Sequence, residues 1–190
     1  MRPSRTYTVE RKKSFMAEKY RFHKDGLFFI TMTVVGWIDV FTRKEYADDI
    51  IKNLNFCIDQ KGLEIYEFCI MPSHIHMICS AKNGEVGKII KDFKSFTAKE
   101  IIKLIENNPQ ESRREWLLYL FRYFANRRND KSEFQFWQHS SHPISLESNK
   151  WIEEKTEYIW YNPVKAGIVT EPQHYIYSSA NPFTKLKIIC

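Results

Sequence analysis

The stretch CIMPSHIHMI, at residues 69–78, limits the fold of this chain more than any other part of the sequence. Pro72 interrupts the apolar run, because a proline has no N–H to donate to a sheet ladder and is tolerated at a turn. Side chains then alternate across the strand that follows, so His74 and His76 share one face and their apolar neighbours fill the other. One face anchors the strand in a core, and the opposite face presents two imidazoles.

Three apolar segments have the period of β-strands. Leu27–Val35 alternates over its whole length and predicts a central strand. Leu63–Ile70 and His74–Ser80 predict two further strands, joined as a hairpin by the Met-Pro-Ser connection. The aromatic run at residues 134–139, FQFWQH, is interpreted as a last strand or an extended segment.

Helices are predicted between these strands. The pattern Thr42–Glu45 is typical of a capping box, apolar residues follow at helical spacing, and Gly62 fits the residue after a helix end. A second helix is expected from Val86 to Ile105, with its lysines on one half of the helical wheel. Residues 107–134 predict a loop, a further amphipathic helix and a charged turn. A last helix should begin near Ser148 and end at an Asn-Pro pair.

This order of elements, β-α-β-β-α-β with added helices, predicts an α+β fold. It is the pattern of a ferredoxin-like split βαβ sheet, antiparallel and covered by helices on one face, with the other face left for a site. With 190 residues and 43% apolar composition, one domain over 1–190 is expected. Residues 1–20 are interpreted as a basic N-terminal tail.

Composition narrows the classes of function. Lys and Arg exceed Asp and Glu by 29 to 23, and the pI is near 9.0, a balance that favours an anionic partner such as nucleic acid. No run of about 18 apolar residues occurs, and the basic N-terminus lacks the apolar region of a secretory signal, so a soluble, cytoplasmic protein without a membrane partner is expected. The cysteines, at 57, 69, 79 and 190, have no CxxC spacing, which argues against a zinc knuckle or a disulfide framework.

The histidine pair is a candidate metal site. Neutral imidazole is a good ligand for divalent ions, and period-2 spacing lets His74 and His76 turn towards one ion without distorting the backbone. The alternative is a pair of half-exposed histidines on a solvated sheet face. Two ligands do not complete a site, so the metal hypothesis requires a third from elsewhere in the chain.

The segment YIWYNPVKAGIV, at residues 158–169, offers such a ligand. Tyr158 and Asn162 are four residues apart, which on a helix places the phenol and the amide one above the other. A side-chain carbonyl oxygen suits a hard divalent cation. The alternative is structural, since Asn-Pro is a good start for a new helical turn.

Together these motifs resemble the HUH superfamily of single-strand DNA nucleases, whose signature is two histidines flanking a hydrophobic residue, here His74-Ile75-His76. IMPSHIHMI, followed by FWQ and YIWYNPVKAGIV, is similar to the REP-associated tyrosine transposases and their insertion-sequence relatives. The resemblance runs from about Tyr20 to Ser179. The chain differs from compact members by a longer charged stretch between Lys99 and Lys131.

The resemblance implies a ferredoxin-like fold with an added C-terminal catalytic helix. It implies that Tyr158 is the nucleophile and that His74, His76 and Asn162 bind Mg or Mn. The expected reaction is metal-dependent cleavage and rejoining of single-stranded DNA, folded as a hairpin, through a 5′-phosphotyrosine link. Because only neutral imidazole binds metal, activity is expected to fall below about pH 6.

DNA contacts are expected from basic side chains, since neutralising phosphates supplies most of the affinity for nucleic acid. For any single one of them, the alternative is an ordinary solvated helix face. The candidates are Lys88, Lys91, Lys94, Arg113, Arg114, Arg122, Arg127 and Arg128.

Two rival functions belong to other classes. One is a single-stranded nucleic-acid-binding module without catalysis, in which the histidine pair is incidental. The other is a hydrolase that uses water as nucleophile, for which Tyr158 would be dispensable. The transposase hypothesis admits a monomer or a homodimer, because single-tyrosine relatives place the catalytic helix either in the same subunit or in its partner.

Overall fold

The computed structural model describes residues 21–127 and 132–189, so the predicted basic tail at 1–20 lies outside the described residues. Its strands form one antiparallel sheet in the order β2-β3-β1-β4. The strands are β1 (Phe28–Thr33), β2 (Leu63–Met71), β3 (His74–Ala81) and β4 (Ile144–Ser145). The helices are α2 (Lys44–Lys61), α3 (Val86–Asn107), α4 (Arg114–Arg127) and α5 (Asn149–Lys165), with 3-10 turns η1 (Val35–Trp37) and η2 (Pro172–His174).

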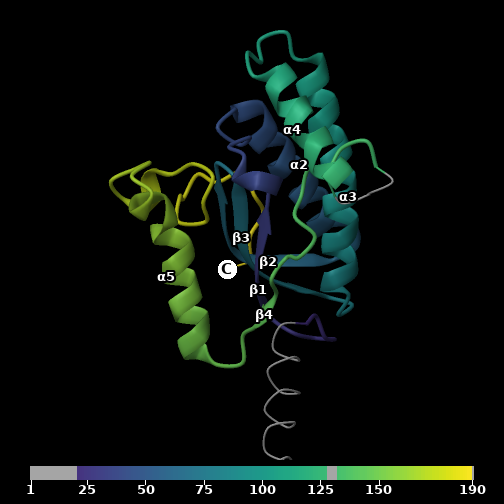
Figure 1. The fold of residues 1–190 in the computed structure, drawn as a ribbon. Helices are drawn as coiled ribbons and strands as arrows, with labels where there is room; N and C mark the ends of the chain where they lie inside the picture. The colour runs from purple at the N-terminus through teal and green to yellow at the C-terminus, as the bar shows by residue number, and fades with distance from the viewer. Residues whose placement is uncertain (1–20, 128–131, 190) are drawn as a thin grey trace, which may run out of the picture.

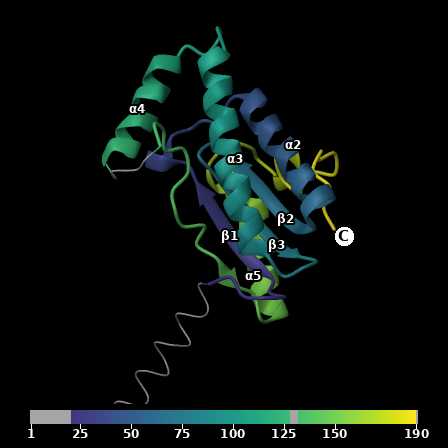
Figure 2. The same cartoon turned by 90° about the vertical axis from the view of Figure 1, so that its right-hand side faces the viewer.

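The sheet is covered on both faces. Helices α2 and α3 lie against one face, and α5 lies against the other (Figure 1). In the perpendicular view α3 and α2 are in front of the sheet and α5 is behind it (Figure 2). The order of strands and the two helices on one face confirm the α+β, ferredoxin-like prediction. No helix within the two described ranges is long and apolar enough to cross a membrane.

Burial follows the predicted alternation. Ile75, Met77 and Cys79 of β3 are fully buried with the apolar faces of α2 and α3 in the larger core. A smaller cluster on the opposite face joins β1, β2 and β3 to α5, with Phe29, Ile78 and Ile159 among its buried members. A buried aliphatic or aromatic side chain contributes about 1.5–3 kcal/mol, so each face retains its helices mainly through this packing.

The ends of α2 only partly follow the sequence prediction. Gly62 ends the helix in the left-handed region, with φ +72°, as expected for a residue without a Cβ. The capping box at the start is wrong: the cap residue is Arg43, and the Thr42 hydroxyl donates instead to the carbonyl oxygen of Asp39. The Glu45 carboxylate accepts a hydrogen bond from the Asn108 side chain, because the α3–α4 connection packs over this end of the helix.

The edge strand lies later than predicted. The 134–139 run is extended and follows β1, where the N–H of Val35 donates to Phe136 and the N–H of Gln138 donates to Thr33. Only an isolated bridge, Val34 to Trp137, has strand geometry there. The edge strand itself is β4, at residues 144–145, which pairs with Phe28 and Phe29. The run is therefore the extended segment of the two alternatives.

Helix α5 begins as predicted and ends later. Ser148 caps it by accepting from the N–H of Trp151. The helix continues past the Asn-Pro pair to Lys165, with Pro163 inside its last turn. Proline lacks the N–H that would close one bond of that turn, and burial of its ring offsets part of this loss.

The C-terminal segment closes the outer edge of β2. The Tyr177 carbonyl accepts from Ile70, the N–H of Ser179 donates to Phe68, and the N–H of Ile189 donates to Ile65. An uncovered edge strand would leave these groups open to pairing with another chain. With α5, this segment leaves only part of the second sheet face open, whereas the sequence predicted a free face.

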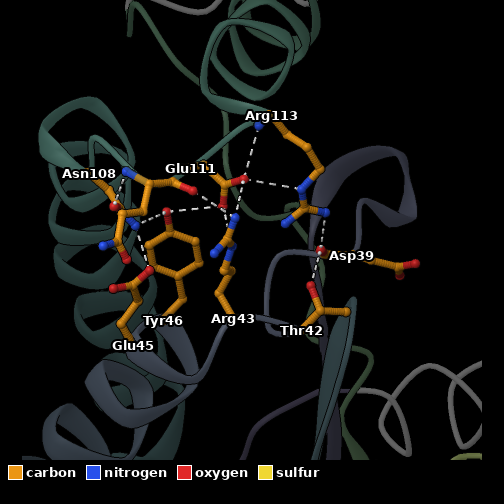
Figure 3. Close-up of polar contacts among 9 residues, drawn as sticks. Asp39, Thr42, Arg43, Glu45, Tyr46, Asn108, Glu111 and Arg113 are labelled. Carbon is orange, nitrogen blue, oxygen red and sulfur yellow. Dashed lines mark hydrogen bonds and ion pairs between the residues drawn. The ribbon is translucent and has the colours of Figure 1, made fainter.

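Helix α4 is joined to the rest of the fold by apolar packing and by a buried carboxylate just before its start. It extends with the end of α3 beyond the sheet (Figure 1), and Leu117 and Phe121 bury its apolar side. At its start the Glu111 side chain is inaccessible to solvent and meets Arg43 at 3.2 Å and Arg113 at 3.3 Å (Figure 3). The Tyr46 hydroxyl donates to the same carboxylate at 3.3 Å.

Burial alone would raise the pKa of Glu111. The hydrogen bonds from Arg113 and the charges of Arg113 and Arg43 outweigh burial and lower that pKa below its usual value. Arg113 also donates to the Asp39 carbonyl at 3.0 Å, so the carboxylate links the α3–α4 connection to the loop after η1 (Figure 3).

We expect Glu111→Ala to lower the free energy of unfolding by about 2 kcal/mol, because it removes the acceptor of the Tyr46 hydroxyl and the negative charge between two guanidinium groups. Glu115→Ala is the matched control: its carboxylate pairs with Arg114 at the exposed surface, where an ion pair contributes at most about 1 kcal/mol. Urea unfolding measures both. Equal losses in the two variants would contradict a structural role for Glu111.

Candidate active site

The two histidines lie side by side on the second face of the sheet. Their ring centroids are 4.6 Å apart, as alternation along β3 predicts. The Nδ1 atom of His76 lies 2.9 Å from the Thr31 hydroxyl, and that of His74 lies 3.2 Å from the Ser73 hydroxyl. Each imidazole is thus held by a hydroxyl group at its own Nδ1 atom.

Tyr158 meets this pair from α5. Its hydroxyl lies 3.5 Å from Nε2 of His76, although 82 residues separate the two in sequence. The anchor is the next residue, Ile159, which is fully buried against the sheet, while the Tyr158 ring keeps 38% of its surface exposed. The phenol and the imidazoles therefore converge within a single chain, and no partner subunit is needed to bring them together.

Other rings and one cation surround the three side chains. Phe29 stacks on His76 with centroids 5.5 Å apart and meets Tyr158 edge-on at 5.9 Å. The Lys155 ammonium, one turn before Tyr158, lies 4.8 Å from the centre of the Phe29 ring. At the other end of the pair the Trp37 ring stands edge-on to His74 at 5.2 Å. The three side chains are thus surrounded by aromatic rings, with one cation beside them.

The environment keeps both imidazoles neutral. Burial lowers the pKa of His76 to about 3, and the neighbouring His74 and Lys155 act in the same direction. Burial also lowers the pKa of His74, although the charge of Asp39 partly opposes it. Protonation of the two histidines, which the sequence predicts near pH 6, therefore occurs at more acidic pH.

The donor groups fit a divalent metal ion. Both rings are neutral, which is the form that binds metal, and the hydroxyl groups of Thr31 and Ser73 at their Nδ1 atoms fix the orientation of the rings and leave Nε2 for an ion. Asn162 follows Tyr158 by one helical turn and is half-buried. Within the described ranges no third His, Cys, Asp or Glu gathers with the pair. The amide of Asn162 is accordingly the third donor to consider, and its role as a ligand stays a prediction.

The predicted DNA-binding lysines of α3 lie on a different layer from the histidines. Helix α3 packs on the face of the sheet opposite the imidazoles (Figure 2). Lys94 turns inward and donates to the carbonyls of Gln138 and His139 at 2.6 and 2.8 Å, and burial lowers its pKa to about 8. Its donors hold the extended segment in place. Lys88 pairs with Glu85, and Lys91 is exposed.

The predicted arginines are distributed around α4. Arg113 belongs to the Glu111 network, Arg114 pairs with Glu115, and Arg122 pairs with Glu133. Arg127 is exposed, and Arg128 lies outside the described residues. In the part of the chain that the structure describes, the side-chain contacts of the histidine pair and Tyr158 come from other residues than these arginines, so the part of the arginines in DNA binding remains a prediction.

Sequence patterns missed several side chains that build the site. The sequence predicts that Thr31 lies on a strand, but only the pairing of β1 with β3 sets it opposite His76. Lys155 carries a usable signal, because it precedes Tyr158 by three residues and so shares its helical face. Trp37 carries none, since it lies in a turn whose path depends on the surrounding structure.

Comparison with known proteins agrees with this arrangement. The sequence model of the IS200-like transposases matches residues 37–139, more than half of the chain and including the strand with both histidines. The chain belongs to the IS200-like transposase family. Members of this family are transposases, so the chain belongs to a family of DNA-processing enzymes.

Two individual proteins are similar to this transposase family member. A Haemophilus influenzae protein, named as a REP-associated tyrosine transposase, is 26% identical over 171 residues, covering 88% of this chain and 86% of the relative. A solved structure of a REP-associated tyrosine transposase bound to a REP hairpin superposes with a TM-score of 0.54 at 17% identity. It covers 84% of this chain and 79% of that one, and the likeness supports the fold.

Burial of His76 predicts a pH-dependent stability in the absence of metal. Its pKa is lower in the folded chain than the usual 6.5, so the unfolded chain binds the proton more readily. The folded chain is therefore most stable, as far as His76 is concerned, above about pH 6.5. Its free energy of unfolding falls as the pH is lowered, by up to about 1.4 kcal/mol per pH unit.

Urea unfolding at pH 7, 6 and 5 in EDTA measures this dependence. His76→Asn removes the titrating group while keeping a polar side chain beside Thr31. Its stability should fall less steeply with acidification than that of the parent. Parallel pH profiles for the two proteins would contradict the assignment.

Proposed function

We propose that this chain is a metal-dependent single-strand DNA endonuclease and strand transferase that works through a 5′-phosphotyrosine intermediate. The observation that carries the proposal is the approach of the Tyr158 hydroxyl to Nε2 of His76, at 3.5 Å, on the partly open face of the sheet. Family membership supports the transposase class. The aromatic rings around the pair support a substrate with flat bases.

In this proposal Tyr158 is the nucleophile. Its oxygen forms a bond to the phosphorus of a scissile phosphate, the bond from phosphorus to the 3′ oxygen breaks, and the departing strand takes a proton as a free 3′-hydroxyl. The phenol proton passes to solvent, to which the ring is open. The energy of the phosphodiester is kept in the new link, so a second strand can be joined by the reverse attack.

The surrounding residues orient the reaction. Ile159 and its buried neighbours anchor α5, so the phenol is held at the imidazoles before DNA arrives, which lowers the entropic cost of reaching the reactive geometry. Lys155 provides a positive charge next to Tyr158, suited to a phosphate oxygen.

His74, His76 and Asn162 would hold Mg or Mn. Bound there, the ion would polarise a phosphoryl oxygen and stabilise the negative charge that develops on it. The neutral state of both imidazoles and the hydroxyl groups at their Nδ1 atoms support this assignment.

The substrate we propose is single-stranded DNA that contains a hairpin. The solved relative was bound to a REP hairpin, and we carry that substrate class to this chain. The single-stranded part suits the site, because base edges and faces are accessible there without opening a duplex.

Tyr158→Phe should abolish the covalent DNA adduct and leave DNA affinity within about twofold, because the ring is kept and only the nucleophilic oxygen is lost. The assay incubates the protein with Mn²⁺ and a pool of labelled hairpins with randomised single-stranded flanks, and detects protein-linked label on denaturing gels. Sequencing the attached DNA identifies the site.

Tyr161→Phe is the control for this test, since its ring is exposed on the same helix. It should form the adduct as the parent does. An adduct in Tyr158→Phe would make another tyrosine the nucleophile, and cleavage without any adduct would favour the hydrolase. Absence of both cleavage and adduct in the parent would favour a binding module.

Thr31→Val should weaken Mn²⁺ binding about 10- to 100-fold, because it removes the hydroxyl that orients His76 and keeps the shape of the side chain. Thr31→Ser keeps the hydroxyl and should bind nearly as tightly as the parent. Calorimetric titration measures the affinities. Equal Mn²⁺ affinity in the parent and Thr31→Val would contradict a metal site at His76.

A further inference from the structure

Trp37 is an exposed indole at the edge of the candidate active site. Its side chain keeps 59% of its surface open to solvent, while one edge meets the His74 ring with centroids 5.2 Å apart and planes at 73°. Burial of a large apolar ring is favourable, so a tryptophan left this open contributes little to the core. Its position needs a reason other than packing.

The backbone of Trp37 has an unfavourable conformation. Trp37 has φ +56° and follows Gly36 at φ +63°, so two successive residues occupy the left-handed region. Glycine does so freely, and a Cβ at Gly36 would come within 2.7 Å of the Phe124 ring of α4. For Trp37 the conformation is costly, by about 1–2 kcal/mol.

Neighbouring contacts maintain that conformation. The N–H of Trp37 donates to the Val34 carbonyl at 3.1 Å, and the N–H of Val34 donates to Ser73, the residue before His74. Val35 and Ile38, on either side of the turn, are buried. Strained residues that the surrounding structure holds in place concentrate at functional sites.

Rings continue from Trp37 across the site. His74 lies next to Trp37, His76 lies 4.6 Å from His74, and Tyr158 lies 5.1 Å from His76. Trp37 and Tyr158 thus mark the two ends of one row. A strand whose phosphate reaches Tyr158 and whose chain follows the row passes over Trp37 within a few nucleotides.

We propose that Trp37 is a stacking platform for a nucleobase of the single DNA strand, close to the phosphate that Tyr158 attacks. The inference rests on the proposed function, in that single-stranded DNA is the ligand. An exposed indole face binds any base, because every base offers a π-face, and such stacking adds affinity without reading sequence. Trp37 positions the strand and takes no part in bond making.

The test compares affinities for a fluorescein-labelled 20-nucleotide oligo(dT), by anisotropy in EDTA at several salt concentrations. All proteins carry Tyr158→Phe, which excludes cleavage. Trp37→Gly removes the ring and places in the turn the residue that accepts positive φ, so the fold should be retained. Trp37→Phe keeps an aromatic face. Phe56→Ala is the matched control, since Phe56 is 54% exposed on α2, across the sheet from the histidines.

Trp37→Gly should lower the affinity about 5- to 150-fold, as expected for the loss of one stacked base. Trp37→Phe should lie between it and the parent, and Phe56→Ala should match the parent. The slope of log affinity against log salt should not change in Trp37→Gly, because no phosphate contact is lost. In contrast, Lys155→Gln should reduce that slope by about one if it contacts a phosphate.

Unchanged affinity in Trp37→Gly, a reduced salt slope in that variant, or failure of the parent to bind oligo(dT) would each overturn the stacking platform. The covalent adduct of the unmodified protein is measured separately. An adduct together with unaltered binding by Trp37→Gly removes the platform alone. Loss of affinity in Trp37→Gly without an adduct in the unmodified protein keeps the platform and removes the Tyr158 mechanism.

Discussion

The register between β1 and β3 is the constraint on which the candidate site depends. It pairs Thr31 with His76 and Thr33 with His74, so that the imidazoles and the hydroxyl that orients one of them share a face. A slip of one residue would turn both histidines into the apolar core under α2 and α3. The alternating apolar side chains of β3 prevent this slip, because it would remove Ile75 and Met77 from the larger core and place two polar rings there without their hydroxyl partners.

The packing of α5 on this face determines both the burial of His76 and the position of Tyr158. By packing Ile159 and its neighbours on the sheet, the helix removes His76 from solvent and brings Tyr158 to it in the same step. The same burial lowers the pKa of His76 and keeps it neutral near physiological pH. The packing of α5 on the sheet therefore contributes both to stability and to the chemistry of the site, and a change that loosens α5 would alter both.

Much of the fold followed from local patterns. Alternation in Leu27–Val35 and around His74, helical spacing after Thr42, and the Gly62 helix end were sufficient for the split βαβ sheet, since each depends on near neighbours in the chain. The capping box at Thr42 was wrong because a partner distant in sequence, Asn108, binds the Glu45 carboxylate. Of the two alternatives for the 134–139 run, the extended segment was correct, and its hydrogen bonds to the end of β1 also join residues distant in sequence.

For the candidate site, the sequence by itself determined which side chains share a face: His74 with His76 on a strand, and Tyr158 with Asn162 on a helix. Those relations depend on the periods of regular structure. Only the tertiary structure decided that the two faces meet, that Thr31 and Lys155 border them, that Lys94 turns inward, and that Trp37 stands exposed beside His74. Such contacts join residues distant in sequence, and no local pattern contains them, because packing of the whole chain sets the distances.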